Sequence, residues 1–121
     1  MASFHHDQAR RNYRVFRLLR DSGYMDWATT ALFYTALHCV DHWLAQIARP
    51  PTSHAERRNS LVRLAVPREG REAYQALYDL SLIARYTQWS GHLNRQRLDE
   101  VHDREYSIVC QHFDAPEEIT P

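Results

Sequence analysis

The sequence contains no lysine, and all fifteen of its basic residues are arginines. An arginine side chain presents a planar fork of N–H donors that suits phosphate groups, whereas lysine presents a single ammonium group. Codon usage in a GC-rich genome is the alternative explanation for the missing lysines. Fifteen acidic residues bring the formal net charge to zero. This balance argues against indiscriminate nucleic-acid binding, although local basic patches can still bind phosphates.

Cysteine and long apolar runs are also scarce. The two cysteines, Cys39 and Cys110, are far apart in the sequence, so they provide neither a disulfide framework nor a CxxC zinc pattern. No apolar run approaches the roughly 20 residues that a bilayer span needs. The first residues lack the apolar stretch of a signal peptide. We therefore expect a cytoplasmic protein with no membrane partner.

With only three glycines and five prolines, the sequence leaves long stretches without a helix breaker. Apolar residues recur at intervals of three and four, and no strand-like alternation of useful length is present. The pattern predicts helices over residues 4–20, 26–48, 54–65, 70–86 and 93–113, with a capping box formed by Ser53 and Glu56. We expect an all-α fold: an antiparallel four-helix bundle with one additional short helix. Residues 1–113 form the expected single domain, and residues 114–121 a loose acidic tail.

The second predicted helix has two faces that do not suit solvent. One face carries a regular apolar stripe, and the opposite face carries aromatic residues and histidines, which include Trp27, Tyr34, His38 and His42. Such a helix lies at the centre of a bundle or at a subunit contact. The spacing of His38 and His42 can also bind a metal ion, but no third ligand is evident, so we assign no metal site.

Three segments resemble the HEPN (higher eukaryote and prokaryote nucleotide-binding) domain family. They are "DWATTALFYTALHCVDHWLA" at 26–45, "PPTSHAERRNSLVR" at 50–63 and "LYDLSLIARYTQW" at 77–89. The resemblance implies a HEPN-like helical bundle that forms a homodimer. Many members of the family are metal-independent ribonucleases that need no cofactor and act as toxins or in phage defence. Others lack the catalytic motif and bind a nucleotide, RNA or a protein partner.

The catalytic motif of the family is an arginine, a polar residue, three to five further residues and a histidine. Four pairs fit this spacing: Arg49–His54, Arg85–His92, Arg95–His102 and Arg97–His102. Arginine and histidine are so frequent here that chance alone produces such pairs, so position must decide. Arg85–His92 crosses the junction into the last helix, where the family has its motif, so we rank it first and the His102 pairs second.

Two observations qualify the Arg85–His92 assignment. Tyr86 follows Arg85, where the family usually has a polar residue. Arg85 also falls at the C-terminal end of a predicted helix, where the helix dipole favours a cation. An ion pair with Asp79 or Asp41 is a further explanation for this arginine. Catalysis by Arg85 and His92 is therefore one of several readings.

Other residues suit the binding of RNA phosphates. His54, Arg57, Arg58 and Asn59 cluster at a helix start, where free N–H groups favour an anion. Arg10, Arg14 and Arg17 share one helix face and could follow an RNA backbone. A solvated helix face is the alternative for both groups. His38, Tyr78, Ser81 and Tyr86 are further candidates to line a site.

The sequence thus supports one leading hypothesis and two alternatives. The leading hypothesis is a HEPN-type, metal-independent endoribonuclease that acts on RNA, with tRNA as one candidate substrate, and serves as a toxin or phage-defence effector with a cognate antitoxin or defence partner. Its products would carry a 2′,3′-cyclic phosphate and a 5′-OH. The alternatives are a non-catalytic HEPN domain and a helical interaction module with no role in nucleic-acid binding.

Overall fold

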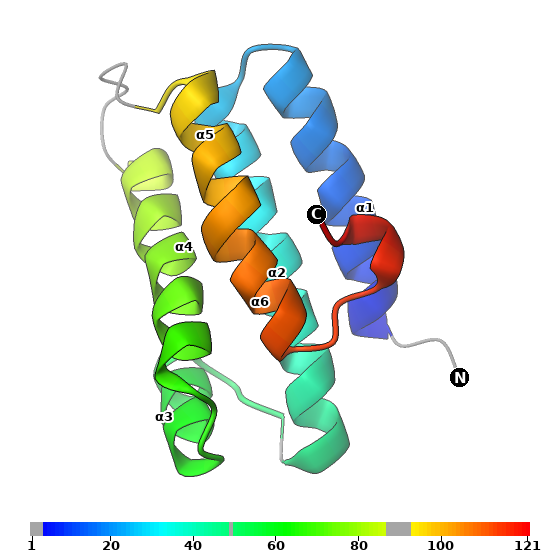
Figure 1. Cartoon of the computed structure of the whole chain (residues 1–121), viewed down its shortest axis with the longest axis vertical. Coiled ribbons are helices and arrows are strands. Elements are labelled where there is room, and N and C mark those ends of the chain that lie inside the picture. Colours follow the sequence, from blue (N-terminus) through cyan, green and yellow to red (C-terminus); the bar gives the residue numbers. More distant parts are fainter. Residues whose placement is uncertain (1–3, 49, 87–92) are drawn as a thin grey trace.

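The structure is a computed structural model that describes residues 4–48, 50–86 and 93–121 (Figure 1). Its longer helices are α1 (Phe4–Asp21), α2 (Met25–Ile47), α3 (His54–Arg63) and α4 (Arg68–Tyr86). They are followed by α5 (Arg95–Val101), a π-helical turn (His102–Tyr106), α6 (Ser107–His112) and a short 3-10 helix (Glu117–Ile119). The described residues contain no strand, so the prediction of an all-α protein is confirmed.

Helix α2 is the central element, as its two non-solvent faces predict. It packs against α1, α4 and α6. Chain direction alternates from α1 to α2, to α4 and to the α5–α6 rod, and these rods lie side by side (Figure 1). Helix α3 is short and lies beside the first turns of α4 (Figure 1).

The core is formed by the apolar stripes that the sequence predicts. Its largest fully buried side chains come from every long element and include Phe16, Phe33, Tyr74, Tyr106 and Phe113. Fully burying a side chain of this size contributes about 1.5–3 kcal/mol, so these contacts hold the helices in place. The helices thereby form a rigid support for the polar side chains between α2, α3 and α4.

Local signals account for the helix boundaries near α3. The Ser53 side chain accepts a hydrogen bond from the Glu56 backbone N–H (3.1 Å), which confirms the Ser53 cap. The Glu56 carboxylate in turn accepts from the Thr52 backbone N–H (2.6 Å), one residue before the position that a standard capping box uses. The predicted last helix is interrupted by the π-helical turn, which the sequence pattern does not reveal.

The C-terminal segment differs from the loose tail that the sequence predicts. Ile119 is only 3% exposed, and the Tyr106 hydroxyl donates a hydrogen bond to the Ile119 backbone carbonyl (2.8 Å). Glu118 pairs with Arg10 of α1. The acidic composition of the segment suggested solvation, but one buried isoleucine and these polar contacts attach it to the helices.

Candidate functional site

The Arg85 guanidinium is held in a fixed position at the C-terminal end of α4. It donates hydrogen bonds to the Tyr34 hydroxyl (2.7 Å), the Ser81 hydroxyl (3.2 Å) and the Ser81 backbone carbonyl (3.2 Å). It also lies over the rings of Tyr34 and Tyr86, at 5.4 Å from each centroid. A guanidinium has five N–H donors, so these three bonds leave two that no hydrogen bond to another described residue uses.

Neither of the ion pairs considered for Arg85 forms. Asp79 accepts a hydrogen bond from Gln75 (2.9 Å), and Asp41 accepts two from Arg57. The Arg85 charge is therefore not compensated by either of these carboxylates. An uncompensated guanidinium beside hydroxyl groups is suited to binding an anion.

His54, at the start of α3, packs against the same face of α4. Its ring lies 4.6 Å from the Tyr78 ring, centroid to centroid, and Tyr78 precedes Arg85 by two helical turns, or roughly 10 Å. The Nδ1 atom of His54 lies 3.1 Å from Arg57 Nη1. Because arginine can only donate, His54 Nδ1 must accept, so the ring proton of neutral His54 is on Nε2.

The pKa of His54 is lowered from its usual value of 6.5. Partial burial is the largest cause, followed by the positive charges of Arg57, Arg85 and Arg58. The same charges show that Arg85 and His54 share one electrostatic environment. The lowered pKa favours the uncharged ring, whose proton is then on Nε2.

The buried pair of Asp41 and Arg57 positions α3 on α2. Arg57 Nε and Nη2 donate to the two oxygens of Asp41 at 2.7 and 3.0 Å, and both side chains are about one-tenth exposed or less. This forked geometry fixes the direction of the arginine. Arg57, one of the residues predicted to bind phosphate, is 7% exposed and also contacts His54 Nδ1.

His38 lies one turn after Tyr34 on α2, in a group of histidines. His38 Nδ1 is 3.0 Å from His5 Nδ1, and the His6 and His42 rings are stacked with centroids 3.4 Å apart. These contacts join the first turn of α1 to α2. Among the described residues, no group of three or more His, Cys, Asp or Glu side chains is arranged to hold a metal ion.

His92, the predicted partner of Arg85, lies outside the described residues, as does Arg49 of the Arg49–His54 pair. The second-choice pairs lie on α5 and the π-helical turn. His102 accepts or donates hydrogen bonds with the Tyr13 hydroxyl (2.7 Å) and Asp103 (2.9 Å), and its side chain is 12% exposed.

The arginines of these pairs have other partners. Arg95 pairs with Asp21 (3.3 Å) and Asp99 (3.7 Å), and Arg97 pairs with Glu100 (3.9 Å). His102 is occupied in an aromatic cluster with Phe16 and Tyr106. The structure does not bring either arginine into contact with His102.

The remaining predicted phosphate ligands are dispersed. Arg10 pairs with Asp7 and Glu118, and Arg17 lies over the Tyr13 ring at 5.2 Å, while Arg14 is exposed. These α1 residues are apart from the Arg85 face. On α3, Asn59 lines a hollow with Pro50 and Pro51, and Arg58 lines a different one.

Of the predicted site residues, the structure thus brings together Arg85, Ser81, Tyr86, Tyr78 and His54. We call this set, with Tyr34, the Arg85 face. Tyr34 and the Asp41 anchor were not predicted as site residues. Tyr34 could have been found from its place on the aromatic stripe of α2, but its bond to Arg85 depends on how α2 and α4 pack.

No described helix combines the length and the apolar character needed to traverse a bilayer. No protein-family model matches this chain, and comparison with curated proteins and with solved structures likewise yields no match.

Proposed function

We propose that this protein is a HEPN-type, metal-independent endoribonuclease that acts as a homodimer. The observation that carries the proposal is the Arg85 guanidinium, which is held by Tyr34 and Ser81 and has two N–H donors that no other described residue uses. His54 supports it, because its Nε2–H is presented on the same side of α4. Both groups suit the non-bridging oxygens of an RNA phosphate.

The proposed reaction needs no metal ion. His92 takes the proton of an RNA 2′-OH, whose oxygen then attacks the adjacent phosphorus. The bond from phosphorus to the 5′ oxygen breaks, and that oxygen receives a proton from a histidine or from water. Arg85 stabilises the charge that grows on the phosphate oxygens. The products are a 2′,3′-cyclic phosphate and a 5′-OH.

The proposal includes a HEPN-like arrangement of the helices and a dimer in which two copies of the motif face each other. Trp27 is 57% exposed and Tyr86 is 78% exposed. Trp27 lies two turns before Tyr34 and therefore on the same side of α2. These exposed aromatic residues favour contact with a second copy beside the Arg85 face. Light scattering of the purified protein tests the dimer directly.

A toxin or phage-defence role extends the proposal to the cell. In this role the protein cleaves RNA, with tRNA as the first candidate substrate, and a cognate antitoxin or defence partner restrains it. Growth arrest on expression of the wild type, relieved by His92→Ala, is the expected result. Equal growth arrest by wild type and His92→Ala would reject this role.

The test of catalysis uses total tRNA and a generic RNA in EDTA. We expect cleavage by the wild type and none by Arg85→Ala or His92→Ala. His54→Gln should reduce the rate but retain cleavage, because it removes a phosphate ligand and not the base. Arg68→Ala is the matched control, since its side chain is 82% exposed and is paired with Glu72 away from the Arg85 face. Equal cleavage by all variants would show that Arg85 and His92 are a chance pair and do not carry the activity.

The second candidate function is a non-catalytic HEPN domain that binds RNA, a nucleotide or a protein partner. Tyr86 favours it, because an exposed aromatic ring stacked on a guanidinium is a platform for an unpaired base. For this function, the wild type binds single-stranded RNA without cutting it. Tyr86→Ala then weakens binding by about tenfold, which corresponds to the usual 1–3 kcal/mol of a base stack.

A further inference from the structure

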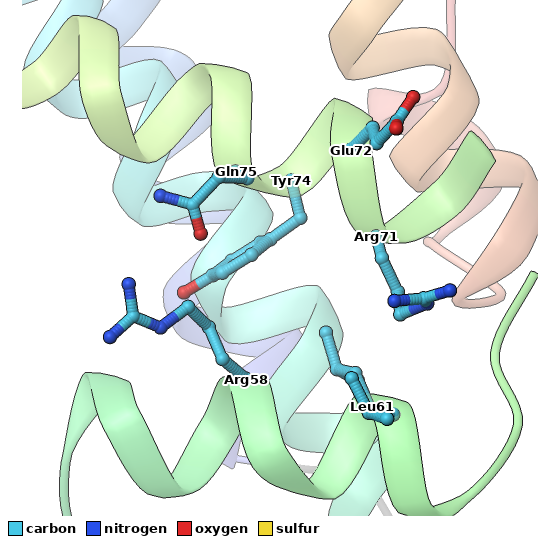
Figure 2. A pocket seen from close by; sticks show the side chains of 7 residues that line it. Arg58, Leu61, Arg71, Glu72, Tyr74 and Gln75 are labelled. Atoms are coloured by element: carbon cyan, nitrogen blue, oxygen red, sulfur yellow. The ribbon is translucent and has the colours of Figure 1, made fainter. Parts of the chain in front are cut away.

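The hollow that Arg58 lines lies between α3 and α4, and none of its lining residues belongs to the Arg85 face (Figure 2). Its volume is about 240 Å³. Sites for drug-sized ligands usually measure about 300–1,000 Å³, so this one suits a single small metabolite. Its lining includes Arg58, Leu61, Val62, Arg71, Tyr74 and Gln75.

The floor of the hollow is apolar. Leu61 is 1% exposed and Tyr74 is 2% exposed, so both are fixed parts of the core. Val62, in contrast, is 59% exposed although it lines the same hollow. A flat apolar ring seated on Leu61 would cover Val62 and remove its methyl groups from water, which is favourable.

The rim of the hollow is positively charged. Arg58 and Arg71 stand at opposite ends of it (Figure 2). Arg71 is anchored through Nε to the Val66 backbone carbonyl (3.0 Å), which leaves its terminal N–H groups for a ligand. The acid that lines the hollow, Glu72, is paired with Arg68 at 2.6 Å. An anionic group is therefore the favoured ligand group at this rim.

Gln75 adds a hydrogen-bond acceptor. Its Nε2 donates a hydrogen bond to Asp79 (2.9 Å), and its amide oxygen takes no part in that bond. Figure 2 shows the oxygen directed toward the Tyr74 hydroxyl and Arg58, and the nitrogen directed away from them. A ligand with an N–H or O–H donor close to its anionic group would satisfy Gln75 and Arg58 together.

We infer that this hollow binds a small aromatic carboxylate that carries an amino or hydroxyl group next to its carboxylate. The ring lies on Leu61 and Val62, the carboxylate bonds to Arg58, and the amino or hydroxyl group donates to Gln75. Charge, apolar surface and acceptor are each matched by one part of this ligand. The inference does not depend on the proposed ribonuclease activity.

Isothermal titration with 2-aminobenzoate tests the inference on the full chain. Benzoate lacks the donor and aniline lacks the anion, so both should bind at least tenfold more weakly than 2-aminobenzoate. The NMR signals of the Leu61 and Val62 methyl groups should shift on binding. Failure of 2-aminobenzoate to bind at millimolar concentration, or equal binding of aniline, would overturn the inference.

Three variants localise the binding. Arg58→Gln should weaken 2-aminobenzoate at least tenfold, because a charge-assisted hydrogen bond is lost. Arg63→Gln is the matched control, since this exposed arginine of α3 does not line the hollow and should leave binding unchanged. Val62→Asp places a negative charge beside the carboxylate of the ligand, so binding should be lost. Because Val62 is exposed, the fold should persist, as judged by circular dichroism. Equal loss in Arg63→Gln and Arg58→Gln, or full binding by Val62→Asp, would refute the assignment.

Discussion

Replacement of Arg57 by methionine is expected to destabilise the protein by about 3–5 kcal/mol, the usual cost of removing one partner of a buried ion pair. The size follows from the geometry: two hydrogen bonds of 2.7 and 3.0 Å join side chains that are 8% and 10% exposed. Without Arg57, the Asp41 carboxylate remains buried and unpaired. A loss of this size is a large part of the roughly 5–15 kcal/mol that stabilises a typical domain.

Urea denaturation followed by circular dichroism measures this effect, and a double-mutant cycle separates the pair from its surroundings. The double variant Asp41→Leu with Arg57→Met buries no charge, so its stability should return to within about 1 kcal/mol of the wild type. Arg68→Met, which breaks the exposed pair with Glu72, is the control and should cost about 0.5 kcal/mol or less. A cost below about 1 kcal/mol for Arg57→Met would show that the buried pair of Asp41 and Arg57 does not stabilise the fold.

Three further predictions follow from the packing. The pKa values of His6, His38 and His42 are lowered below 6.5, in each case chiefly by burial, so the unfolded chain binds more protons than the folded one. The free energy of unfolding should therefore be fully present above pH 6.5 and fall as the pH drops below it. The melting temperature of the double variant His38→Gln/His42→Gln should depend less on pH than that of the wild type. In Gly70→Ala the new methyl group would lie 2.9 Å from His112 Cγ. The overpacking cost of about 1–3 kcal/mol should exceed the roughly 1 kcal/mol gain in helix propensity, and urea denaturation measures the net loss of stability. The double variant Gly70→Ala/His112→Ala should lose less stability, because the clashing ring is absent. Tyr106→Phe removes the donor to the Ile119 carbonyl and should cost about 1–2 kcal/mol, and amide exchange near the C-terminus should accelerate; unchanged exchange there would show that this bond does not hold the segment.

The sequence predicts the helices well because their signals are local. The stripes of α1, α2 and α4 depend on the helical period alone, and the Ser53 cap needs only three following residues. The π-helical turn at His102–Tyr106 has no such signal. The docking of Ile119 was missed because it depends on a hydroxyl thirteen positions earlier in the chain.

The candidate site is only partly predictable, for the same reason. The ridge of Tyr78, Ser81 and Arg85 follows from the spacing on one helix. The bond from Arg85 to Tyr34 spans 51 positions, and that from Arg57 to Asp41 spans 16, so both depend on the packing of α2 against its neighbours. Charge pattern alone therefore could not tell that Arg57 is buried and paired with Asp41, while Arg85 bonds to the hydroxyl groups of Tyr34 and Ser81.

In the function proposed above, Arg85 acts on an RNA phosphate without a metal ion. The most direct measurement compares wild type and Arg85→Lys in EDTA, on an RNA and on the same RNA with 2′-O-methyl groups, with analysis of the product ends. We expect 2′,3′-cyclic phosphate products from the wild type on unmodified RNA only, and little activity from Arg85→Lys, which keeps the charge but loses the forked donors. Cleavage of the 2′-O-methyl RNA, or full activity of Arg85→Lys, would contradict it.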